Sequence, residues 1–104
     1  MRRIRFHPAA AVEAEEAAVW YSTEQPGLGS QFGIALEEAL AHLYQDVIPS
    51  TRYPHLPERM NAQRLQLRRF PYDLVFLVGE EEIVIVAVAH HRRRPGYWRA
   101  RMAT

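Results

Sequence analysis

The amino-acid sequence predicts an α+β fold: an N-terminal strand, then an antiparallel two-helix hairpin packed on one face of a mostly antiparallel sheet of three to four strands. Helix-forming residues occupy most of residues 9–46, and strand-like segments occupy most of residues 64–90. A chain of 104 residues with 48% hydrophobic and 24% charged residues suits a single domain that spans residues 1–104.

A short strand and a helix open the chain. Ile4 and Phe6 alternate with arginines over residues 2–7, as in a half-buried strand. Pro8 suits the first turn of a helix, because a proline there loses no hydrogen bond. Residues 9–23 are rich in alanine and glutamate, and a stripe of small residues at helical spacing should let this helix approach a neighbour closely. The stripe consists of Ala10, Ala14 and Ala17 and ends in the aromatic Tyr21.

A second helix follows a break at residues 25–29. One proline and two glycines interrupt the helical pattern there. Residues 30–46 resume it, with an apolar face that includes Phe32, Leu36 and Leu43. Because the break is short, the two helices are expected to lie antiparallel.

The second half of the chain is strand-like. Residues 49–61 contain three prolines and are interpreted as an ordered loop, and residues 92–104 as a short tail or helical turn. Gly79, Glu80 and Glu81 suit a hairpin turn between the last two strands. The predicted strands are residues 64–68, 72–78 and 82–90.

Both faces of the last two strands are apolar. A sheet with one face in water should alternate apolar and polar residues, but these strands do not. The helical hairpin covers one face, so the other needs the C-terminal tail, a second copy of the chain, or a different protein. In the strand at 72–78, one face is expected to hold Leu74, Phe76 and Val78. In the strand at 82–90, one face is expected to hold Ile83, Ile85 and Ala87, and the other face Val84, Val86 and Val88. The face in need of a cover is expected to include Val75, Leu77, Val84 and Val86.

Charge is unevenly distributed along the chain. Residues 1–46 hold three arginines and seven acids, whereas residues 47–104 hold ten arginines and five acids. All thirteen basic residues are arginines, whose planar guanidinium groups suit phosphate and carboxylate. Since arginine stays protonated, none of these cations can serve as a base near neutral pH.

Several classes of site are absent from the sequence. Without cysteine, the chain can form no disulfide and has no thiolate ligand or cysteine nucleophile, which fits the cytoplasm. No apolar stretch approaches the roughly 18 residues of a membrane span, and the basic N-terminus is not followed by an export signal. Adjacent His90 and His91 on a strand would point to opposite faces, and the other histidines lack ligand spacing. Neither a metal nor a cofactor is expected.

Two basic segments with interleaved aromatic residues are candidates for binding a macromolecule. They lie at residues 68–72 and 90–101, where guanidinium groups could hold phosphate and aromatic rings could stack on bases. The alternatives are a solvated chain end for the second segment and packing for Phe70 and Tyr72. The candidate target-binding residues are Arg68, Arg69, Arg92, Arg93, Arg94, Tyr97, Trp98, Arg99 and Arg101.

Four short segments, in the correct order, resemble RelE/ParE-type toxins of type II toxin–antitoxin systems, also known as plasmid stabilisation proteins. They are residues 6–10 with the helix that ends in Trp20-Tyr21, residues 26–29 with Phe32, residues 68–72, and residues 87–98. The resemblance covers nearly the whole chain.

This resemblance implies a cytoplasmic toxin that a small cognate antitoxin neutralises. Antitoxins of such systems typically wrap the toxin with a helix and an extended segment, and they usually also bind DNA. The apolar face with Val75, Leu77, Val84 and Val86 is therefore the expected antitoxin contact. ParE-like members act on DNA gyrase, whereas RelE-like members cut messenger RNA on the ribosome.

Trp20-Tyr21, residues 26–29 and residues 95–98 look more like the ParE-like branch, which implies inhibition of gyrase without catalysis by the toxin. The alternative is a metal-independent, ribosome-dependent endoribonuclease, which needs a base, an acid and cations around the phosphate. Its catalytic residues would be His90 or His91 as base, Arg92 or Arg93 on the phosphate and Tyr97 as support, with Glu58 as a further candidate base.

Overall fold

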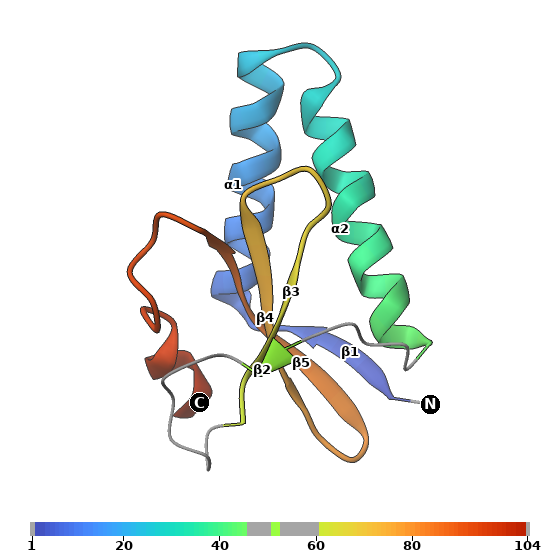
Figure 1. Ribbon diagram of the computed structural model, residues 1–104, viewed down its shortest axis with the longest axis vertical. Coiled ribbons are helices and arrows are strands. Elements are labelled where there is room, and N and C mark those ends of the chain that lie inside the picture. The colour runs from blue at the N-terminus through green and yellow to red at the C-terminus, as the bar shows by residue number, and fades with distance from the viewer. Residues whose placement is uncertain (1, 46–50, 53–60, 104) are drawn as a thin grey trace.

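The computed structural model describes residues 2–45, 51–52 and 61–103. The order of elements confirms the predicted α+β class (Figure 1). The elements are β1 (Arg3–Phe6), α1 (Pro8–Glu24), α2 (Leu28–Tyr44), β2 (Thr51–Arg52), β3 (Gln63–Gln66), β4 (Tyr72–Val78), β5 (Glu82–His90) and a C-terminal 3-10 helix (Arg99–Ala103). Within the described residues, no helix is long and apolar enough to cross a bilayer.

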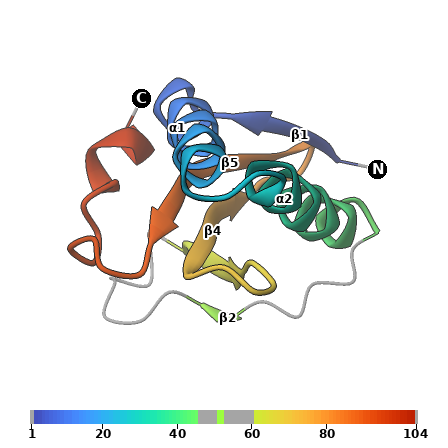
Figure 2. The same ribbon diagram turned by 90° about the horizontal axis from the view of Figure 1, so that it is seen from above.

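The described strands form one mixed sheet in the order β1-β5-β4-β3-β2, which can be followed in Figure 2. Only β1 and β5 pair in parallel, so the sheet is mostly antiparallel, as predicted. It has five strands instead of three or four because β2 pairs with β3 inside the segment predicted as a loop. Most of that predicted loop lies outside the described residues.

The helical hairpin packs closely on one face of the sheet. Ala10, Ala17 and Tyr21 of the small-residue stripe are buried, which confirms the role predicted for that stripe. The helices approach each other closely at Gly29, because a Cβ there would lie 1.9 Å from Ser22 Oγ and 2.5 Å from the Ala18 carbonyl oxygen. The two helices run side by side and antiparallel in Figure 1.

An aromatic cluster joins the hairpin to the sheet. The Tyr21 ring lies 5.5 Å from that of Phe32 and 4.9 Å from that of Phe70. Phe32 also lies 5.2 Å from Tyr72. Phe70 and Tyr72 are therefore packing residues, which confirms the alternative given above for these two aromatic side chains.

A β-bulge in β5 changes which residues share a face. Val75 pairs with Ala87 and Phe76 pairs with Ile85, so Val86 is an extra residue in the ladder. A bulge reverses the alternation beyond it. Ala87 therefore lies with Val86 on the face away from the helices, and Val88 lies on the helix face. The predicted faces of Ala87 and Val88 were wrong for this reason.

The chain itself covers the second face of the sheet. Trp98 is 0% exposed and packs in a cluster with Val75 and Val86, which are 0% and 1% exposed. Leu77 and Val84 are only half-buried at the margin of this cluster. The C-terminal tail, one of the three covers considered, packs on this face, so Val75 and Val86 are buried within the chain itself and do not form an open surface in this structure.

Candidate functional site

The two basic segments meet at one end of the sheet. The pairing of Tyr72 with His90 places the start of β4 beside the end of β5. In addition, the His91 amide donates to the Pro71 carbonyl oxygen at 2.8 Å. The β3–β4 turn with Arg68 and Arg69 therefore shares this end with the arginines that follow β5.

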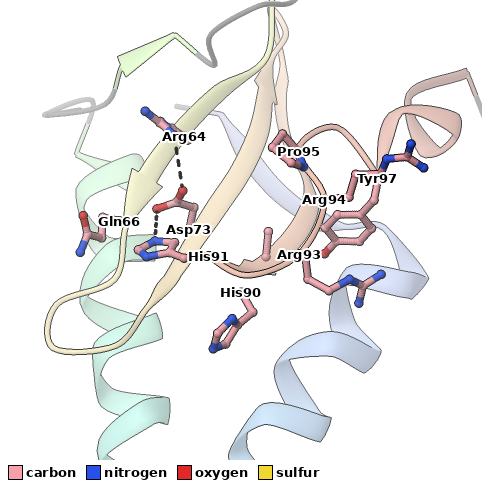
Figure 3. A pocket seen from close by; sticks show the side chains of 10 residues that line it. Arg64, Gln66, Asp73, His90, His91, Arg93, Arg94, Pro95 and Tyr97 are labelled. Carbon is pink, nitrogen blue, oxygen red and sulfur yellow. Dashed lines mark hydrogen bonds and ion pairs between the residues drawn. The ribbon is translucent and has the colours of Figure 1, made fainter.

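A cavity of about 480 Å³, here called the basic groove, lies between the strands and the loop after β5 (Figure 3). Among the described residues, three guanidinium groups and one carboxylate line it. Its lining residues are Arg64, Gln66, Asp73, Ala89, His90, His91, Arg93, Arg94, Pro95 and Tyr97. Arg68 and Arg69 line a smaller hollow against α2 instead.

Asp73 contacts basic side chains from both sides of the basic groove. Its Oδ1 lies 3.1 Å from His91 Nε2, and its Oδ2 lies 3.9 Å from Arg64 Nη1 (Figure 3). The Asp73 side chain is only 13% exposed. The carboxylate is therefore set back in the groove, whereas the arginines reach solvent.

The two histidines have different surroundings. His90 Nδ1 accepts a hydrogen bond from the Arg92 amide at 3.0 Å, so a neutral His90 ring carries its proton on Nε2. Burial, and then the nearby Arg92 and His91, lower the pKa of His90 below its ordinary value. His90 is thus neutral near pH 7, with its one lone pair already engaged.

Glu13 on α1 organises the tail that bounds the groove. Its carboxylate accepts hydrogen bonds from Tyr97 Oη at 2.5 Å and from both terminal nitrogens of Arg101 at 2.8 and 3.0 Å. The Val88 amide also donates to Glu13, at 3.0 Å. Glu13, Tyr97 and Arg101 are here called the Glu13 clasp.

The geometry of the sheet explains why the clasp forms. The pairing of β1 with β5 reaches only to Phe6 and Ile85. Beyond that point, Glu13 accepts from the Val88 amide, and Arg101 donates to the Val86 carbonyl oxygen at 3.1 Å. Side chains thus satisfy backbone groups that a neighbouring strand would otherwise satisfy.

The clasp fixes the protonation of its members. Burial opposes ionisation of Glu13, but hydrogen bonds from Arg101, Tyr97 and Val88 outweigh it and hold the pKa of Glu13 below its ordinary value. Burial, and then the hydrogen bond to Glu13, raise the pKa of Tyr97 far above its ordinary value. Tyr97 therefore remains a neutral donor and is not a base near pH 7.

The predicted site residues divide into exposed and internal ones. Trp98 is fully buried, so its predicted contact with a target was wrong for this conformation. Arg101 is held by Glu13, and the Tyr97 ring lies 3.9 Å from the Arg93 guanidinium carbon. The exposed candidates are Arg68, Arg69, Arg92, Arg93, Arg94 and Arg99.

Sequence reasoning missed Glu13, Arg64 and Asp73. Asp73 carried a signal, because it is the one acid in an otherwise apolar strand. Glu13 carried none, because it is one of several glutamates in its helix. Glu58, the further candidate base, lies outside the described residues, and no metal-binding group of three His, Asp or Glu side chains occurs in the described part of the chain.

Comparison with known proteins identifies the family. The model of the family "ParE toxin of type II toxin-antitoxin system, parDE" matches residues 4–95. The chain belongs to the ParE toxin family. The matched range contains both helices, all of the sheet except Arg3, and the basic groove as far as Pro95. The match confirms the predicted family and the ParE-like branch of it.

A solved structure supports the fold of this ParE family member. It is similar to a chain of the chromosomal ParDE toxin–antitoxin system from P. aeruginosa, with a TM-score of 0.72 and 21% identity. The match covers 86% of this chain and 96% of that chain. No curated protein sequence matches the chain significantly.

Proposed function

We propose that this ParE family member is a cytoplasmic toxin that binds and inhibits DNA gyrase, and that a cognate antitoxin neutralises it. The family match supports the general role, and the protonation states of the basic groove support inhibition without catalysis. The observation that carries the choice is that two of the candidate catalytic side chains are engaged in roles that leave neither free to act as a base: His90 accepts from the Arg92 amide, and Tyr97 donates to Glu13.

RNA cleavage needs a group that accepts a proton near neutral pH. His90 uses its lone pair on the Arg92 amide, and Tyr97 remains a donor to Glu13. Arginine does not deprotonate. A protein that grips its target through arginines has no such requirement, and exposed guanidinium groups surround the groove.

One observation favours the endoribonuclease as a second candidate function. His91 Nε2 lies 3.1 Å from Asp73 Oδ1, which is the geometry of a base held by an orienting carboxylate. Arg93 and Arg94 line the same cavity and could hold a phosphate. In that function His91, through Nδ1, would be the base.

Two assays on the purified protein separate these functions. We expect inhibition of gyrase supercoiling and intact message on translating ribosomes. His91→Asn should leave the supercoiling inhibition nearly unchanged, as should the control His42→Asn on the exposed side of α2. Cleavage of the message at codon positions, at a rate that falls by about 10²-fold or more in His91→Asn but not in His42→Asn, would contradict gyrase inhibition and show that the protein is an endoribonuclease.

The antitoxin is proposed to contact Leu77 and Val84, which the tail leaves half-exposed. Contact with Val75 and Val86 would require Trp98 to move away, since the three side chains pack together. Expression of this chain without a cognate antitoxin should arrest growth, and co-expression with that antitoxin should relieve the arrest. Normal growth on expression of the chain alone would contradict the proposed toxic activity.

A further inference from the structure

We infer that the basic groove binds phosphate groups of a duplex DNA backbone, so that the toxin contacts DNA as well as its protein target. This inference rests on the proposed function, because gyrase acts on DNA. It assigns a ligand class to the cavity of about 480 Å³ between β3, β4 and the loop after β5.

The groove presents positive charge from two sides. Arg64 extends from β3 on one side, and Arg93 and Arg94 extend from the loop on the other (Figure 3). The one carboxylate among the described lining residues, Asp73, is 13% exposed and is faced by His91 and Arg64. The accessible rim is therefore cationic and suits a polyanion.

The arginines differ in how firmly they are placed. Arg93 lies over the Tyr97 ring, with its guanidinium carbon 3.9 Å from the ring centroid, and Tyr97 in turn is fixed by Glu13. Arg94 is exposed and forms no ion pair within residues 2–45 and 61–103. One cation is thus preset in position, and the next can turn toward phosphate oxygens.

The aromatic residues of the groove argue against reading of bases. Recognition of single-stranded RNA relies on unstacked bases that stack on exposed aromatic rings. Here Trp98 is fully buried and Tyr97 already carries Arg93 on its ring. Among the described residues, three guanidinium groups line the groove, whereas its one exposed aromatic ring, the imidazole of His91, already contacts Asp73. This excess of cations over free rings favours contacts with a duplex backbone, independent of sequence.

The test is titration of a short mixed-sequence DNA duplex with the full chain at several salt concentrations. A variant that no longer neutralises one phosphate should show a slope of log affinity against log salt that is smaller by about 0.9. Arg94→Gln and Arg93→Gln should each show this change and bind the duplex several-fold more weakly. Arg3→Gln is the matched control, because it also removes an exposed arginine, but from β1, which forms the edge of the sheet away from β3 and the groove.

Three results would overturn the inference: equal slope changes in Arg94→Gln and Arg3→Gln, tighter binding to single-stranded RNA of the same length, or tighter binding to polyglutamate. Supercoiling assays on the same variants separate this inference from the proposed function. Inhibition of gyrase without DNA binding refutes the groove assignment alone. DNA binding without inhibition refutes the gyrase assignment alone.

Discussion

Glu13 links three parts of the chain that are distant in sequence: α1, β5 and the C-terminal 3-10 helix. It accepts hydrogen bonds from the backbone of Val88 and the side chains of Tyr97 and Arg101. Because Arg93 stacks on Tyr97, the carboxylate also sets the position of one arginine of the basic groove. Glu13, which does not line the groove, thus positions two residues that do, Tyr97 directly and Arg93 through the Tyr97 ring.

Replacement of this carboxylate gives the first prediction. Glu13→Gln removes the charged partner of Arg101, whose side chain is 18% exposed, so the guanidinium charge loses its compensation. Hydrogen bonds to charged groups contribute about 1.5–3 kcal/mol each, and we expect the free energy of unfolding to fall by about 2 kcal/mol. Urea unfolding at neutral pH measures this change. The control Glu16→Gln, at an exposed position of α1, should change it by less than about 0.5 kcal/mol.

The same variant has a predictable pH dependence. The folded-state pKa of Glu13 is held below the ordinary value of 4.5, so its contribution to stability is present above that value and is lost as pH falls through the folded-state pKa. The gap between wild type and Glu13→Gln should therefore narrow in acid. A gap that stays constant down to about pH 2 would show that the charge of Glu13 is not what stabilises the tail.

At the scale of elements, the helical hairpin depends on one glycine. Gly29→Ala would place a methyl group 1.9 Å from Ser22 Oγ and 2.5 Å from the Ala18 carbonyl oxygen, so the helices must separate. Overpacking of this kind costs about 1–3 kcal/mol. The matched control is Gly33→Ala in the same helix, where nothing lies within 4 Å and the better helix propensity of alanine should stabilise by up to about 1 kcal/mol.

Thermal unfolding of these two variants checks the prediction, since the melting temperatures should move in opposite directions. Ser22→Ala added to Gly29→Ala should restore only part of the stability, because the Ala18 backbone remains in the way. Equal melting temperatures for Gly29→Ala and Gly33→Ala would mean that the helices are not in close contact at Gly29.

The elements also show what local sequence pattern can and cannot predict. The bounds of β4 and β5 agree with those predicted, because β-branched and aromatic residues bounded by a glycine turn are a local signal. The bulge at Val86 has no such signal, since it arises from the pairing of two strands. The assumption that successive side chains point to opposite faces therefore misplaced Ala87 and Val88, although the composition of the segment identified the strand itself.

At the scale of the whole molecule, the tail was the hardest part to predict. The basic segment was visible in the sequence, but Tyr97 and Arg101 find their partner 84 and 88 positions away. No local pattern encodes a contact of that separation. The exposed arginines of the groove could be found because charge is read directly from sequence, whereas Trp98 was misassigned because its burial depends on the tertiary fold.

Substitution of Trp98 therefore tests whether the C-terminal tail covers the second face of the sheet. Trp98→Ala would uncover Val75 and Val86 on the second face of the sheet, and removal of so large a buried side chain costs about 3–5 kcal/mol. Urea unfolding should show this destabilisation, and a dye that binds exposed apolar surface should brighten with Trp98→Ala. Trp20→Ala is the control, because Trp20 is 55% exposed and its removal should cost less than about 1 kcal/mol.

Trp98→Phe, which keeps a ring over the valines, should recover much of the stability. If Trp98→Ala were no worse than Trp20→Ala, the tail would not be holding the second face closed, and that face would again be open to the antitoxin.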